Sequence, residues 1–67
     1  MSLLTVQELD AIRAQLQIEE NLIRQLTASA HTARDPQLRG LFEQIAARHR
    51  LHWEQLETLL QTGEKEG

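Results

Sequence analysis

Apolar residues recur every three or four positions in two stretches of the chain, and each stretch predicts one long amphipathic helix. The repeated positions are Leu9, Ile12, Leu16, Ile23, Leu26 and Ala30 in the first stretch, and Leu38, Phe42, Ile45, Leu56 and Leu59 in the second. The residues between them are mostly good helix formers such as Ala, Gln, Glu and Arg. The pattern predicts helices over residues 5–33 and 36–62, followed by a disordered tail over residues 63–67.

Local signals mark where the two helices begin and where the chain turns. Thr5 followed three residues later by Glu8 is a capping box, which starts a helix. Asp35 and Pro36 favour an N-cap and a first helical turn, because proline is tolerated there and the residue before it avoids the α region. A connection this short makes the helices antiparallel neighbours. We therefore expect residues 1–67 to form one all-α domain, an antiparallel helical hairpin.

Folding the chain back about residue 34 pairs apolar positions with apolar positions, except near the middle. There Glu19 lies level with His49, since both are about fifteen residues from the turn, and His52 lies level with Leu16. A carboxylate and two imidazoles thus occupy positions where a simple two-helix hairpin would carry Leu or Ile. We call Glu19, His49 and His52 the Glu/His cluster.

Composition limits what such a cluster can belong to. A chain of 67 residues forms a marginal core by itself, and the lack of cysteine excludes disulfides and thiolate metal sites. Oligomerisation and a His/carboxylate metal site remain as sources of stability. The formal net charge is −3 with no basic stripe, which argues against nucleic acid as a partner. No apolar run approaches the roughly 20 residues of a membrane span, and no export signal is recognisable, so we expect a cytoplasmic protein.

Further apolar residues lie outside the predicted helix contact and call for a partner. They are Ile18, Leu22, Leu41, Trp53 and Leu60. A homodimer of hairpins that forms a four-helix bundle is the commonest way to bury such a surface. A two-fold axis perpendicular to the bundle would bring both copies of the Glu/His cluster to one level.

The cluster allows two interpretations. His49 and His52 are three residues apart on one helix and project to the same side, as two ligands of one metal ion would. Glu19 needs a cation or a strong donor, because a buried carboxylate without one is rarely tolerated. Its partner can be a divalent transition metal or a protonated histidine, and the second case gives a metal-free polar layer that fixes the register of the helices.

The arrangement resembles the ferritin-like di-iron proteins, in which a mid-helix Glu and a Glu-x-x-His pair on the next helix meet inside a four-helix bundle. Here the corresponding residues are Glu19 and the segment His49-Arg50-Leu51-His52, within the stretch ARDPQLRGLFEQIAARHRLHWEQL. The length is similar to that of the two-helix members, the encapsulated ferritins and spore-coat-related proteins, which build their site by dimerisation. The resemblance implies metal binding by Glu19 and His52, with His49 in the place of a bridging glutamate.

Two functions from different classes therefore stay open. One is a metal-binding subunit that binds or oxidises iron, and the other is a coat or shell-associated structural module without metal. The missing bridging carboxylates predict at most weak ferroxidase-like activity. Two divalent ions per dimer would leave an excess of positive charge unless Glu20, hydroxide or an outside anion supplied the deficit. Iron, zinc and copper all suit imidazole ligands, and copper and zinc outrank ferrous iron in simple competition.

Overall fold

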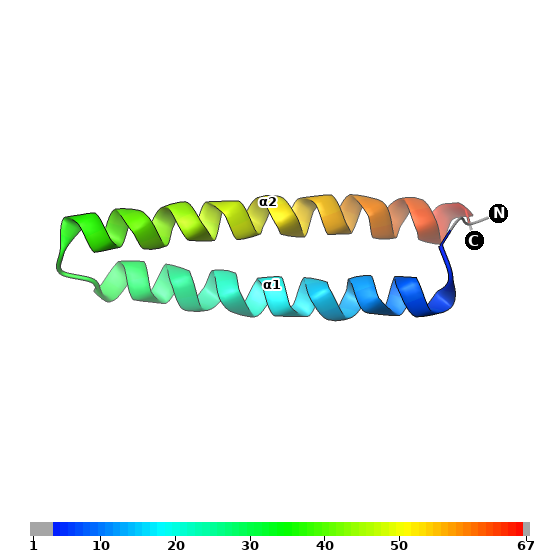
Figure 1. The fold of residues 1–67 in the computed structure, drawn as a ribbon, viewed down its shortest axis with the longest axis horizontal. Coiled ribbons are helices and arrows are strands. Elements are labelled where there is room, and N and C mark those ends of the chain that lie inside the picture. Colours follow the sequence, from blue (N-terminus) through cyan, green and yellow to red (C-terminus); the bar gives the residue numbers. More distant parts are fainter. Residues whose placement is uncertain (1–3, 67) are drawn as a thin grey trace.

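The computed structural model describes residues 4–66 and shows an antiparallel hairpin of two long helices (Figure 1). Helix α1 spans Val6–Thr32 and helix α2 spans Pro36–Glu66. The hairpin is about 51 Å long and only 14 Å by 11 Å across. The predicted all-helical hairpin is thus confirmed. Within the described residues, neither helix has an apolar stretch long enough to cross a membrane.

The predicted start signals are present in atomic detail. The Thr5 hydroxyl accepts from the backbone N–H of Glu8 at 3.0 Å, and the Glu8 carboxylate accepts from the backbone N–H of Thr5 at 2.9 Å. At the turn, Asp35 Oδ2 accepts from the backbone N–H of Leu38 at 2.8 Å. These bonds satisfy donors that a helix start leaves unpaired, so both helices begin where the sequence predicts.

The predicted end of the second helix at residue 62 is wrong, because α2 continues to Glu66. Gly63 is buried, and a Cβ atom there would lie 2.9 Å from Leu9 Cδ2, so the missing side chain lets α2 lie close to α1. Glu64 adds an ion pair with Arg13 at 3.0 Å. Residues 63–66 are therefore helical and in part packed, where a disordered tail was predicted; Gly67 lies outside the described residues.

The side of α2 that faces α1 also differs from the prediction. Ala46 is 2% exposed and Leu60 is 8% exposed, and Leu60 packs in one cluster with Ile12 and Leu16. Leu59, which was predicted to face α1, is 46% exposed. Trp53 packs against the same cluster instead of lying beyond it. The helix carries two adjacent apolar stripes, and one partner helix can cover only one of them.

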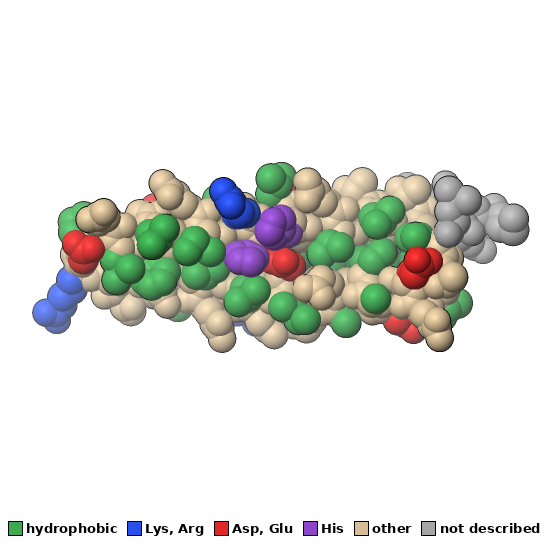
Figure 2. All heavy atoms as spheres, viewed as in Figure 1, with side chains coloured by type: hydrophobic (Ala, Val, Ile, Leu, Met, Phe, Trp, Pro, Cys, Tyr) green, Lys and Arg blue, Asp and Glu red, His purple; other side chains and the backbone are tan. Residues whose placement is uncertain are grey.

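The uncovered stripe of α2 and the neighbouring side of α1 form what we call the apolar face. It consists of Ile18 and Leu22 on α1 and of Leu38, Leu41, Ile45 and Leu59 on α2. All of these side chains are at least 37% exposed except Leu22, which is partly buried. Figure 2 shows hydrophobic side chains of both helices on this face, with two histidines and an acidic residue among them.

Two helical glycines should respond in opposite ways to substitution by alanine. A Cβ atom at Gly40 has no neighbour within 4 Å, so Gly40→Ala should raise the free energy of unfolding by about 0.5–1 kcal/mol. Gly63→Ala should gain less or lose stability, because its methyl group would press against Leu9. Urea unfolding of both variants at one protein concentration measures the difference. A destabilising Gly40→Ala would show that another chain approaches this position.

Candidate metal centre

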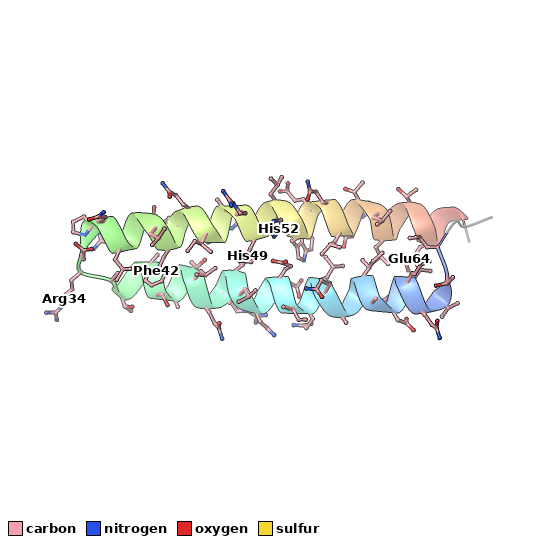
Figure 3. All side chains as sticks on the ribbon, viewed as in Figure 1. Arg34, Phe42, His49, His52 and Glu64 are labelled. Carbon is pink, nitrogen blue, oxygen red and sulfur yellow. The ribbon has the colours of Figure 1, made fainter. Side chains whose placement is uncertain are left out.

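The Glu/His cluster lies at the middle of the hairpin, where both helices contribute to it. Glu19 is the one charged residue among the buried side chains of the described part of the chain, at 7% exposure. His49 and His52 project from the middle of α2 towards α1, where Glu19 lies (Figure 3). Their three-residue spacing keeps them on one side of the helix. The structure therefore brings together the three residues that the sequence singled out.

Each imidazole faces a different oxygen of the same carboxylate. The distance from His49 Nδ1 to Glu19 Oε2 is 2.6 Å, and the distance from His52 Nδ1 to Glu19 Oε1 is 3.6 Å. The two rings are perpendicular, with centroids 5.4 Å apart. One potential ligand atom from each of the three residues lies within 4.8 Å of the other two. A single ion can thus reach all three side chains.

The distances indicate how much the cluster must move to hold an ion. Ligand atoms about 2.0–2.1 Å from a tetrahedral ion lie about 3.3 Å from one another. The 3.6 Å separation of His52 and Glu19 is close to that value, whereas the 2.6 Å contact of His49 is a direct hydrogen bond. Binding would exchange this hydrogen bond for two metal bonds. It would require His49 Nδ1 and Glu19 Oε2 to move apart by less than 1 Å. The ligand atoms of the two histidines lie within 4.8 Å of each other and would also have to approach, by up to about 1.5 Å.

Exposure rises across the cluster from the helix contact to the apolar face. The side chain of Glu19 is 9% exposed, that of His49 is 23% exposed and that of His52 is 44% exposed. The carboxylate therefore forms the floor of the cluster and His52 its outer edge. A fourth coordination position would open outward, between apolar side chains of the two helices (Figure 2).

The other polar residues of the two helices do not complete the candidate centre. Glu20 accepts a hydrogen bond from Trp53 Nε1 at 3.3 Å, so its carboxylate is directed to the indole and not to the cluster. Arg50 donates to Thr27 Oγ1 at 3.2 Å. His31 lines a polar groove with Arg39 and does not join the cluster. The candidate centre thus contains one carboxylate and two imidazoles.

This donor set suits the borderline transition metals, because zinc, copper, nickel and iron all accept imidazole nitrogen together with carboxylate oxygen. Three protein ligands with an open fourth position are typical of sites that take a further small ligand. The same side chains can also satisfy one another, and within the described residues no buried polar side-chain atom lacks a hydrogen-bond partner. The geometry therefore allows a metal site and a metal-free polar layer.

Comparison with known proteins adds no further information about the site. No protein-family model, no curated protein and no solved structure matches this chain. The ferritin-like resemblance therefore depends on the helices and on the Glu/His cluster alone.

Proposed function

We propose that this protein is a metal-binding, ferritin-like half-bundle in which Glu19, His49 and His52 hold one transition-metal ion. The observation that carries the proposal is the grouping of one carboxylate and two imidazoles within 4.8 Å at a part-buried position. A buried carboxylate next to two histidines destabilises a core this small, and binding of a metal ion to the folded state would offset that cost. Each hairpin offers all three ligands, which favours one ion per chain.

We further propose that a second copy of the hairpin covers the apolar face and completes a four-helix bundle. The face surrounds the opening of the cluster, so a partner placed there would shield the ion from water. Leu41 and Ile18 are 50% and 47% exposed, and a chain of 67 residues has little other core to rely on. The dimer thus stabilises the fold and encloses the site.

The charges of the hairpin favour a partner that runs in the opposite direction. Every arginine except Arg13 lies in the half of the hairpin near the turn, between residues 24 and 50, while most acidic residues lie in the other half. The acidic residues of that other half include Glu8, Asp10, Glu54, Glu57 and Glu64. A two-fold axis perpendicular to the bundle places the basic half of each copy over the acidic half of the other. It also brings the two Glu/His clusters to the same level.

A metal-free function is the second candidate, and one contact favours it. The 2.6 Å hydrogen bond between His49 and Glu19 already satisfies the buried carboxylate without an ion. In that case the polar layer would set the register of a structural module, such as a subunit of a coat or shell. Metal analysis of the purified protein separates the two candidates, because a bound ion removed by His49→Ala but not by His31→Ala would support the first alone.

The identity of the ion gives a prediction of its own. Zinc and copper should bind more tightly than ferrous iron, because the site is rich in imidazole and follows the usual order of affinities. Oxygen-dependent oxidation of added ferrous iron should be slow, since the cluster contains one carboxylate and no bridging pair. Competition dialysis and absorbance during iron addition measure both. Rapid oxidation of two ferrous ions per dimer would restore a di-iron function.

A further inference from the structure

The candidate centre would carry a net positive charge once a divalent ion is bound. A divalent ion brings two positive charges, Glu19 contributes one negative charge, and neutral imidazoles contribute none. We propose that the metal-loaded cluster binds a small oxyanion, a carboxylate or phosphate, which ligates the ion in the fourth position and accepts hydrogen bonds from Arg48. This inference rests on the proposed metal site and names the ligand class that the site takes.

The chain does not supply the missing negative charge from its own described residues. Glu20 is the nearest neighbour of Glu19 in sequence, but its carboxylate is bonded to the indole of Trp53 at 3.3 Å. The described residues that could share one ion are Glu19, His49 and His52, with no second carboxylate among them. The balancing anion therefore has to come from outside the hairpin.

Arg48 is placed to select the anion. It precedes His52 by four residues and follows Ile45 by three, so helical spacing puts it on the apolar face. A basic side chain lies beside the two histidines on that face (Figure 2). Among the described residues, no ion pair or hydrogen bond involves the Arg48 side chain, whereas Arg50 donates to Thr27 on the other side of the hairpin.

The guanidinium geometry favours an oxyanion over hydroxide. A carboxylate or phosphate has several oxygens, so one can ligate the ion while another accepts from the planar fork of Arg48. Hydroxide offers a single oxygen for both tasks. Covering of the face by a second copy would strengthen this preference, because two loaded clusters and two arginines would otherwise bring uncompensated positive charge into a low-dielectric interface.

The test uses the full chain loaded with Co²⁺, whose visible absorption reports its ligands. Acetate and inorganic phosphate are titrated separately at constant ionic strength, with perchlorate as the weakly coordinating counter-ion. We expect a saturable spectral change that ends at one anion per Co²⁺. Arg48→Gln should lower the affinity for the anion by about tenfold or more, while the affinity for Co²⁺ in perchlorate alone stays the same. Arg50→Gln is the matched control and should behave like the unchanged protein.

The outcomes separate this inference from the proposed function. Failure of Co²⁺ to bind in perchlorate would overturn the metal site, and the inference with it. Co²⁺ binding without any spectral response to acetate or phosphate would overturn only the inference. An equal anion affinity in Arg48→Gln and Arg50→Gln would overturn the role of Arg48. A response to only one of the two anions would support the inference and identify the preferred ligand.

Discussion

Glu19→Leu should lose the proposed metal binding, with an affinity at least about 100-fold lower than that of the unchanged protein, because the ion would lose its one charged ligand. The hairpin should nevertheless keep its fold and gain stability or stay unchanged. Leucine suits the position, since Glu19 is buried between the two helices and the remaining histidines are partly exposed. Zinc titration calorimetry and thermal unfolding followed by circular dichroism measure the two effects.

Neighbouring carboxylates provide the control for this prediction. Glu20→Gln also removes one negative charge, but from a side chain that accepts a hydrogen bond from Trp53. This variant should leave zinc affinity unchanged. Glu19→Gln keeps the shape and removes the charge, so its affinity should also fall sharply. Unchanged zinc binding in Glu19→Leu would refute the site as drawn. Loss of the helical fold in that variant would instead favour the metal-free polar layer.

Leu41→Glu should dissociate the proposed dimer, because each protomer would bring a carboxylate into the proposed apolar interface. Leu41 is 50% exposed in the hairpin and belongs to the apolar face. We expect the dimer to weaken by at least about 100-fold, since burying an unpaired charge costs several kcal/mol. The helices should remain, and each chain should still hold an ion, because all three ligands belong to one hairpin. Sedimentation equilibrium at micromolar concentration measures the association.

Ala47→Glu is the control for the apolar face. Ala47 is exposed, and its spacing of six residues from Leu41 places it about 120° away around α2, off the apolar face. The control should therefore associate as the unchanged protein does. Equal association of both variants would place the interface elsewhere. An unchanged protein that sediments as a well-folded monomer would rule out the proposed four-helix bundle.

Local chemistry made the start of each helix, the turn and the level of the cluster predictable from sequence. Thr5 with Glu8 and Asp35 with Pro36 act over three or four residues, so their hydrogen bonds follow directly from spacing. The shortness of the turn then fixes which residues share a level, and this is why the pairing of Glu19 with His49 follows from the sequence. The number of residues between the turn and each side chain is therefore enough to predict the cluster.

The rotation of α2 about its own axis could not be predicted in the same way. Leu59 and Leu60 are both apolar, and spacing alone does not decide which of them faces α1. Small residues decide it in three dimensions, because Ala46 and Gly63 allow the two helices to approach closely along one stripe. Gly63 predicted the end of the helix, because glycine commonly ends helices and because the close approach of Leu9 depends on the tertiary structure and not on local sequence.

X-ray absorption at the zinc edge of the loaded protein, after removal of free metal by gel filtration, tests the metal site most directly. We expect one zinc per chain with nitrogen and oxygen ligands at about 2.0–2.1 Å and the outer-shell scattering of two imidazoles. His31→Gln should give the same spectrum, since His31 lies outside the cluster. A protein that retains no zinc, or whose bound zinc has fewer than two imidazole ligands, would contradict the assignment of Glu19, His49 and His52.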